Sequence, residues 1–123
     1  MATSKPTFRS RIKEFRYMPA SQLKANKSNW RIHPQAQFDS LRMILKEVGY
    51  VGAVIARELP DKTLQIIDGH LRTGISEMGG KDELVPTLIV DLTEKEAKKI
   101  LATYDPISAM AETDTEALDK LLK

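Results

Sequence analysis

The residue types best suited to chemistry stand side by side at Asp68, Gly69, His70 and Arg72. A carboxylate, an imidazole and a guanidinium can bind an anion and exchange a proton, and a glycine lets the backbone approach a ligand closely. The aliphatic residues of the stretch 64–67 predict a short buried strand just before them. The reactive side chains are therefore expected where a strand ends.

A helix is predicted to follow that strand, because apolar residues recur three to four positions apart as far as Met78. His70 and Arg72 then lie on its first turn. The first N–H groups of a helix lack partners and its dipole adds partial positive charge, so this turn can hold a phosphate with Arg72 completing the clamp. A phosphate there would favour the charged form of His70. The alternative is an ordinary turn capped by Asp68, with His70 and Arg72 in water.

Composition limits the class of protein. The chain has 123 residues, of which 41% are hydrophobic and 29% charged, which predicts one soluble globular domain. No apolar run approaches the ~18 residues of a membrane span, and no signal peptide is visible. The absence of cysteine excludes disulfides, thiol nucleophiles and cysteine zinc sites, and it suits a cytoplasmic protein. With only two histidines, no metal site is predicted.

The small net charge hides an asymmetry. Residues 1–42 carry nine lysines and arginines against two acidic residues, a net charge of +7, whereas the remainder carries ten against fifteen, a net charge of −5. A basic N-terminal part favours a polyanionic partner, either nucleotide phosphates or DNA bound without sequence specificity. The alternative for residues 5–13 is a basic tail surrounded by water.

The remaining pattern predicts an α+β or mixed α/β domain, a small mixed sheet flanked by three or four helices. Strands are predicted over residues 14–23, 51–58, 63–68 and 84–91, and helices over residues 35–48, 70–78, 93–101 and 113–122. Thr93 and Glu96 have the spacing of a capping box, and Tyr104 to Pro106 are expected to break the helix that it opens. The expected division is a flexible leader (1–13), a domain (14–112) and a C-terminal helix (113–123) whose apolar stripe calls for a partner domain or a homodimer.

Five segments together resemble a known family: Asn29-Trp30-Arg31-Ile32-His33-Pro34, residues 41–49, Ile66-Ile67-Asp68-Gly69-His70-Leu71-Arg72, Val85-Pro86 and Leu92-Thr93-Glu94-Lys95-Glu96. In order and spacing, over residues 14–112, they resemble the ParB N-terminal domain, also called the ParB-like nuclease domain of the ParB/sulfiredoxin superfamily. The Asp-Gly-His-x-Arg form is most similar to domains of phages and of bacterial DNA-modification proteins, where the module often precedes a DNA methyltransferase. The resemblance implies a ParB/sulfiredoxin-like fold.

The resemblance also implies chemistry at the central turn. In chromosome-partitioning ParB proteins a Gly-Glu-Arg-Arg box binds the CTP triphosphate, and its glutamate serves hydrolysis. Gly69 and Arg72 match that box, whereas His70 replaces the glutamate and Leu71 replaces the first arginine. Sulfiredoxins carry their reactive cysteine at the position of His70, so sulfiredoxin chemistry is excluded in a chain without cysteine. A third branch phosphorylates free serine with a carboxylate as base, and Asp68 would take that role here.

The resemblance also implies nucleotide contacts from two further loops. Arg31 is the basic residue of a loop whose arginine contacts the nucleotide, and Gly49 and Gly52 lie in a loop whose backbone approaches it. The implied ligand contacts are Gly69, His70, Arg72, Thr73, Arg31, Asn29, Gly49 and Gly52, with acid/base roles for His70 and Asp68. The implied ligand is a nucleoside triphosphate, CTP or else ATP, with Mg²⁺ held mainly by its phosphates. Two functions stay open: a nucleotide-binding module acting in DNA binding, partition or DNA modification, and an enzyme, either a nuclease or a small-molecule kinase such as a free-serine kinase.

Overall fold

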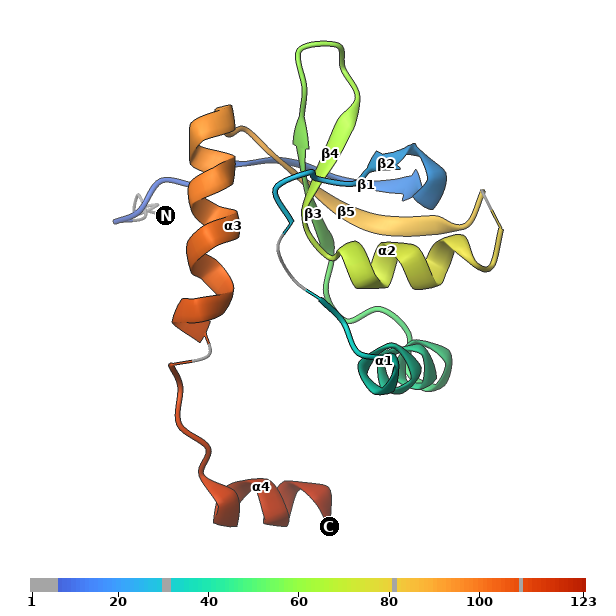
Figure 1. Cartoon of the computed structure of the whole chain (residues 1–123), viewed down its shortest axis with the longest axis vertical. Coiled ribbons are helices and arrows are strands. Elements are labelled where there is room, and N and C mark those ends of the chain that lie inside the picture. The colour runs from blue at the N-terminus through green and yellow to red at the C-terminus, as the bar shows by residue number, and fades with distance from the viewer. Residues whose placement is uncertain (1–6, 30–31, 81, 109) are drawn as a thin grey trace, which may run out of the picture.

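A five-stranded mixed sheet in the order β1-β5-β3-β4-β2 organises the protein (Figure 1). The computed structural model describes residues 7–29, 32–80, 82–108 and 110–123. The strands are β1 (Ile12–Pro19), β2 (Leu23–Lys24), β3 (Val54–Glu58), β4 (Leu64–Asp68) and β5 (Leu84–Val90). The helices are the short 3₁₀ helix η1 (Ala20–Gln22) and α1 (Gln35–Glu47), α2 (His70–Glu77), α3 (Glu94–Ser108) and α4 (Thr115–Leu122). This is the α+β architecture that the sequence predicts.

Strand pairing explains where the central turn lies. β3 and β4 form an antiparallel hairpin, as predicted, and β5 then returns parallel to β3 on its other side. β4 brings the chain back to the end of the sheet at which β3 begins, and α2 with its flanking turns then carries the chain past β3 to the start of β5. The β4–α2 turn therefore sits at the end of two central strands, where their side chains and a helix start meet.

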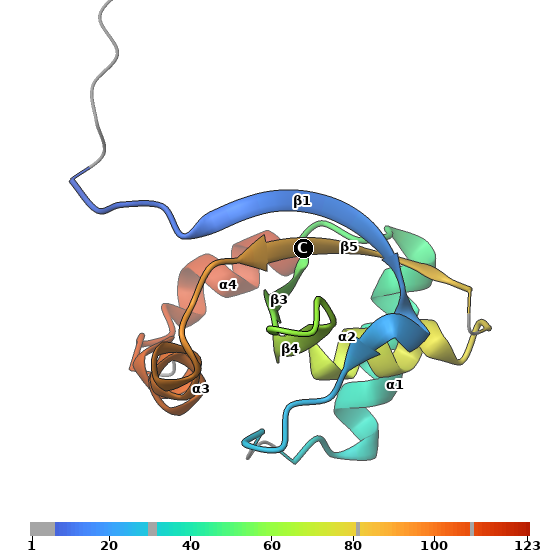
Figure 2. The same ribbon diagram turned by 90° about the horizontal axis from the view of Figure 1, so that it is seen from above.

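The sheet buries a different cluster on each face. The larger cluster lies on the side of η1 and α2 and consists of Ala20, Leu23, Val54, Ala56, Leu64, Ile66, Val85 and Ile89. The smaller one lies under α3 and consists of Ile67, Val90, Ala97 and Leu101. Burying a side chain such as Ile89 contributes about 1.5–3 kcal/mol, so the larger cluster supplies most of the apolar stabilisation. Figure 2 shows α3 and α2 on opposite sides of β3 and β4.

Two helices lie outside this arrangement. α1 packs mainly against α2, and none of its residues is fully buried. α4 stands apart from the rest (Figure 1), and none of its residues is buried. Within the described residues, no helix combines the length and apolar character that crossing a membrane requires.

The structure corrects several predicted boundaries. The first strand begins at Ile12 and ends at Pro19, so part of the predicted leader is ordered; the carbonyl of Arg11 accepts a hydrogen bond from the N–H of Asp91 at 2.8 Å. β3 begins at Val54 rather than at residue 51. Met78 lies beyond the end of α2 and is 66% exposed. The buried residues of this helix are Thr73 and Ile75, so Met78 does not belong to its buried face.

The predicted helix break at residues 104–106 was also wrong. α3 continues as one helix from Glu94 to Ser108 and includes Pro106. A proline removes one helical N–H and crowds the preceding turn. Here it stands two residues before the helix ends, where few hydrogen bonds remain to be lost.

Candidate phosphate site

The β4–α2 turn requires glycine for reasons of fold alone. Gly69 has φ 106°, in the left-handed region, and directly precedes the first residue of α2. A Cβ at this position would lie 2.8 Å from Cγ2 of Val54 and 3.2 Å from its Cα. Any side chain would therefore adopt a strained backbone and collide with β3. The chain can turn directly from β4 into a helix packed on the sheet because this position has no side chain.

No side chain of the described residues caps the start of α2. Gly69 occupies the cap position, and its carbonyl accepts hydrogen bonds from the N–H and the hydroxyl of Thr73, both at 2.9 Å. Asp68, the cap of the alternative interpretation, instead accepts a hydrogen bond from Nη2 of Arg72 at 3.4 Å. The positive end of the helix dipole is therefore not closed by a carboxylate or hydroxyl cap.

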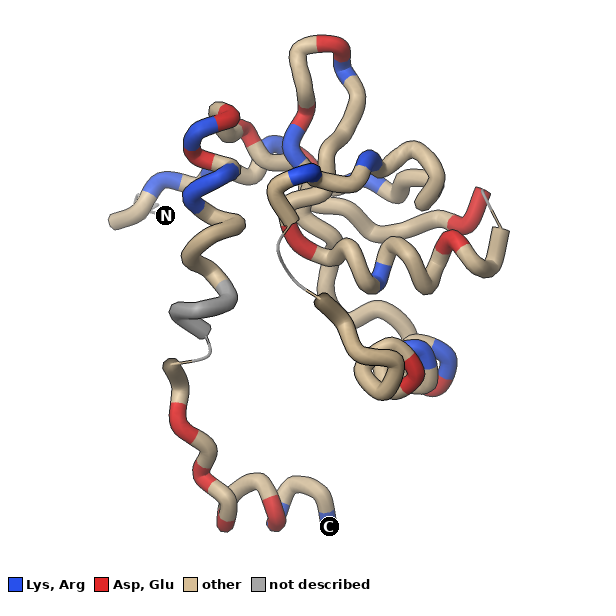
Figure 3. The backbone as a smooth tube through the Cα atoms, in the orientation of Figure 1, with Lys and Arg blue, Asp and Glu red and all other residues tan. Residues whose placement is uncertain are grey.

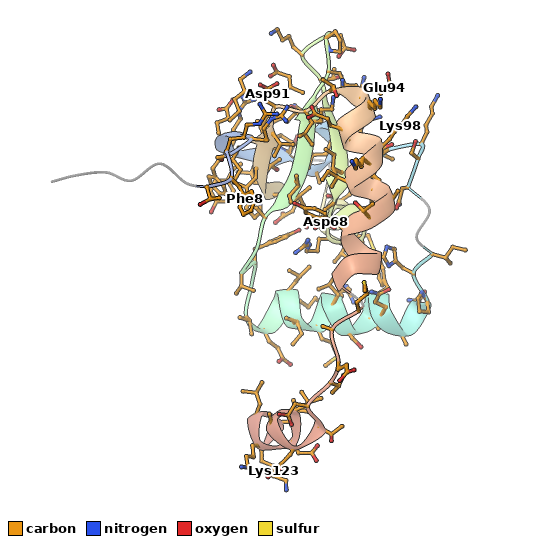
Figure 4. All side chains as sticks on the ribbon, turned by 90° about the vertical axis from the view of Figure 1, so that its left-hand side faces the viewer. Phe8, Asp68, Asp91, Glu94, Lys98 and Lys123 are labelled. Atoms are coloured by element: carbon orange, nitrogen blue, oxygen red, sulfur yellow. The ribbon has the colours of Figure 1, made fainter. Side chains whose placement is uncertain are left out.

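A cavity of about 180 Å³ lies at this helix start. Its lining combines the turn with the beginning of α1: Asp68, Gly69, His70, Leu71, Arg72, His33, Gln37 and Leu41. Figure 4 shows Asp68 at the end of the sheet that faces α1. Pockets that enclose a drug-sized ligand measure about 300–1,000 Å³, so this one has room for phosphate groups rather than for a whole nucleotide.

Arg72 lies between the turn and the loop that joins α1 to β3. Its side chain is 28% exposed, and a Cβ on Gly52 would lie 3.5 Å from its Nη1. The hydroxyl of Tyr50 donates to the carbonyl of Arg72 at 3.1 Å and also hydrogen-bonds the hydroxyl of Ser76. These bonds tie the Gly52 loop to α2, so the guanidinium faces a backbone that carries no side chain at its nearest point.

His70 holds a neighbouring loop in place. Its Nε2 accepts a hydrogen bond from the N–H of Asn26 at 3.0 Å. A ring nitrogen that accepts carries no proton, so Nε2 is the acceptor in this contact. The ring thereby orders a turn in which Asn26 also accepts from the N–H groups of Ser28 and Asn29. That a bound phosphate would favour the charged form of His70 stays a prediction.

The remaining predicted contacts fall in different places. Arg31 lies outside the described residues. Asn29 belongs to the turn after Asn26 and does not line the cavity. Gly49 has φ 100° and follows the end of α1, where a Cβ added to it would meet no described heavy atom within 4 Å. Thr73 is 4% exposed and bonded to the turn.

Four neighbours of the turn were not predicted. His33 and Gln37 line the cavity and are joined by a 2.7 Å hydrogen bond, while Tyr50 and Ser76 brace the facing loop. Tyr50 directly follows Gly49, and an aromatic residue next to a predicted ligand loop was the one local signal available. Among the described residues, no group of three or more histidine, aspartate or glutamate side chains is placed to hold a metal ion.

Comparison with known proteins identifies the fold. No family model matches the chain, and no curated protein matches it. Solved proteins of several kinds share its fold, and three of them illustrate the range. C-terminally truncated chromosome-partitioning protein ParB from Caulobacter crescentus, complexed with CTP-gamma-S, aligns with a TM-score of 0.70 and 21% identity over 87% of this chain. A second structure of that protein, complexed to the centromeric parS site, aligns at 0.56 with 20% identity, over 69% of this chain and 43% of that one.

The other two proteins are enzymes by name. Sulfiredoxin from Arabidopsis thaliana aligns at 0.58 with 15% identity, over 72% of this chain and 98% of that one. A free serine kinase in complex with AMP aligns at 0.52 with 18% identity, over 72% of this chain and 36% of that one. The chain therefore has the ParB/sulfiredoxin fold, and it spans 61% of the ParB chain complexed with CTP-gamma-S.

Proposed function

We propose that this protein is a nucleotide-binding module of the ParB type, whose β4–α2 turn holds the phosphates of a nucleoside triphosphate. One observation carries the proposal: a phosphate-sized cavity lies at a helix start that no described side chain caps, and Arg72 lines it. Backbone N–H groups at a helix start and a guanidinium both favour phosphate oxygens, the latter with two parallel hydrogen bonds.

Phosphate binding would change the ion pair already present. Arg72 and Asp68 are 3.4 Å apart, and an incoming phosphate would compete with Asp68 for the guanidinium. The carboxylate would repel the phosphates unless a cation lay between them. Mg²⁺ bound to phosphate oxygens and water would supply that charge, and the Asp68 carboxylate could assist in holding it.

CTP is the first nucleotide to test. The ParB structure with the higher similarity contains CTP-gamma-S, whereas the kinase structure with lower similarity contains AMP. The small cavity accommodates only the phosphates, so the base and sugar would lie outside it. ATP is the second ligand to test.

The decisive experiment titrates CTP, ATP and GTP, with Mg²⁺, against the wild type and Arg72→Ala. Loss of a charged hydrogen-bond donor is expected to raise Kd about 10- to 100-fold. Arg42→Ala is the matched control, because this arginine is exposed on α1 and does not line the cavity. Equal and negligible binding by the wild type and Arg72→Ala would remove the nucleotide proposal.

DNA is the second proposed ligand, in partition or in DNA modification of the phage or methyltransferase-associated kind. Lysines and arginines are spread over the N-terminal segment, β1, β2 and α1, whereas acidic residues dominate the segment that leads into α4 (Figure 3). The ParB protein of the same fold was determined with its parS site. Contacts of this kind are electrostatic, so we expect binding to duplexes of unrelated sequence that weakens steeply with salt.

The alternative is a small-molecule kinase of the same fold. Asp68 lines the cavity and could remove a proton from a substrate hydroxyl, the role of a general base. Incubation with ATP, Mg²⁺ and free serine separates the two functions: phosphoserine that disappears in Asp68→Asn would favour the kinase. Plasmid DNA with Mg²⁺, in a parallel reaction, tests for a nuclease.

A further inference from the structure

Among the residues that the structure describes, no strand pairs with the outer edge of β1. β1 is the terminal strand of the sheet and has eight residues, whereas the strand at the opposite edge, β2, has two. Seven residues of β1 pair with β5, with a register shift between Ile12 and Glu14. Figure 2 shows β1 along the outside of the molecule. An edge of this length presents a row of backbone N–H and C=O groups that another extended chain can pair with.

The side chains on one face of this edge are apolar. Phe15 is 52% exposed and Tyr17 is 60% exposed, and their rings meet edge to face with centroids 5.3 Å apart. They border a hollow of about 550 Å³ that is lined without any charged side chain by Phe15, Tyr17, Tyr50, Val51, Gly52, Ala53, Leu84 and Pro86. Exposed apolar surface beside an open edge marks a contact surface.

The other face of the same strand carries two opposite charges. Glu14 and Arg16 alternate with Phe15 and Tyr17 along β1, so they project from the opposite side, where they form an ion pair with each other. A chain that pairs with this edge must therefore match an aromatic residue on one face and both charges on the other.

We propose that the edge pairs with itself: β1 of one copy aligns antiparallel to β1 of a second copy, with Phe15 opposite Phe15. In this register Glu14 of each copy lies opposite Arg16 of the other, on both sides of the two-fold axis. Opposite charges that face each other across a strand pair are attractive, and aromatic pairs add to them. One surface on each copy makes the whole contact, as a two-fold interface requires.

The charges select this register over its neighbours. Centring the pair on Arg16 would place Arg16 opposite Arg16, and centring it on Glu14 would place Glu14 opposite Glu14. A shift by one residue would set Phe15 opposite Arg16 and turn the apolar face toward the charged one. Of these registers, the one centred on Phe15 matches faces and charges together over residues 14–16, so this part of the edge fits a second copy of this chain.

A charge-swap series tests the pairing by sedimentation velocity over a range of protein concentrations. Glu14→Arg and Arg16→Glu each place like charges opposite each other twice, and each is expected to raise the dimer dissociation constant about tenfold or more. The double variant Glu14→Arg/Arg16→Glu restores both opposite pairs and is expected to recover the wild-type dissociation constant. Lys98→Glu is the matched control, because it reverses the charge of an exposed ion-pair residue on α3.

A cross-link tests the register directly. The chain has no cysteine, so Phe15→Cys introduces a single thiol at the proposed two-fold axis. Directly opposite residues of an antiparallel pair have Cα atoms about 4.5–5.5 Å apart, which a disulfide can span. Mild oxidation should give a covalent dimer with Phe15→Cys and not with Met43→Cys, which lies exposed on α1.

Several results would overturn the proposal. A wild type that stays monomeric at all concentrations would do so, as would a dimer that neither single reversal weakens. A double variant as weak as the single ones would show that the edge contacts a strand of another kind. None of these results depends on nucleotide binding.

Discussion

The two helices that follow strands β4 and β5 begin in opposite ways. α3 starts with a closed capping box: the N–H of Glu96 donates to the hydroxyl of Thr93 at 3.2 Å, and the N–H of Thr93 donates to the Glu96 carboxylate at 2.9 Å. The guanidinium of Arg11 adds two hydrogen bonds to that carboxylate, at 2.7 and 2.9 Å. α2 starts at Gly69 with no side-chain cap, in the part of the chain that the structure describes.

The capped start of α3 stabilises the fold, whereas the start of α2 is suited to bind an anion. At α3 the chain's own carboxylate occupies the position that an external anion would take. At α2 the carboxylate of Asp68 accepts a hydrogen bond from Arg72, and a cavity lies at the start of the helix. Packing against Val54 already explains the glycine that precedes α2. The glycine is therefore no evidence for a bound ligand, whereas the open start of the helix is.

The largest expected effect comes from closing the α2 turn with a methyl group. Gly69→Ala is expected to destabilise the protein by about 2–4 kcal/mol, because it adds left-handed strain to a collision with β3. Gly74→Ala is the matched control in the same helix: nothing lies within 4 Å of its added Cβ, and the change should stabilise by about 0.5–1 kcal/mol. Urea unfolding measures both, and equal stabilities would show that the turn tolerates a side chain.

Removing the side-chain cap of α3 is expected to have a smaller effect on stability. Thr93→Ala removes the hydroxyl that accepts from the N–H of Glu96 and is expected to lower the free energy of unfolding by about 1 kcal/mol. Thr103→Ala in the same helix serves as control, because its hydroxyl only bonds back to the carbonyl of Lys99 and alanine is the better helix former. If Thr103→Ala lowered the free energy of unfolding as much as Thr93→Ala, the capping position would be no more important than the helix interior.

The smallest effect is a change in acid stability. Hydrogen bonds from Arg11, and then from the N–H of Thr93, lower the pKa of Glu96 from 4.5 to about 2. A carboxyl whose pKa is lower in the folded state stabilises the fold above pH 4.5, and this contribution is lost as the pH falls toward 2. Glu96→Gln should therefore give a flatter dependence of unfolding free energy on pH between 4.5 and 2, measured by urea unfolding at several pH values. An unchanged slope would mean that the Arg11 contact does not persist in solution.

Much of this contrast was readable from local sequence. Thr93 and Glu96 stand three residues apart, and the strand, turn and helix around Gly69 also follow from neighbouring residues. The contacts that give the turn its surroundings join distant residues: 44 positions separate His70 from Asn26, 22 separate Tyr50 from Arg72, and 85 separate Arg11 from Glu96. Side-chain types do not specify such pairs, because many other pairings would satisfy the same donors.

By itself the sequence determined that a glycine turn leads from a buried strand into a helix whose first turn carries His70 and Arg72. It also determined the capping box, since both features depend on spacing within a few residues. Only the tertiary structure decided that His70 accepts a hydrogen bond from Asn26, that Gly52 faces Arg72, and that β1 lies at an edge of the sheet. Those outcomes depend on which distant strands and loops pack together. The spacing of residues within a few positions of one another carries no information about such contacts.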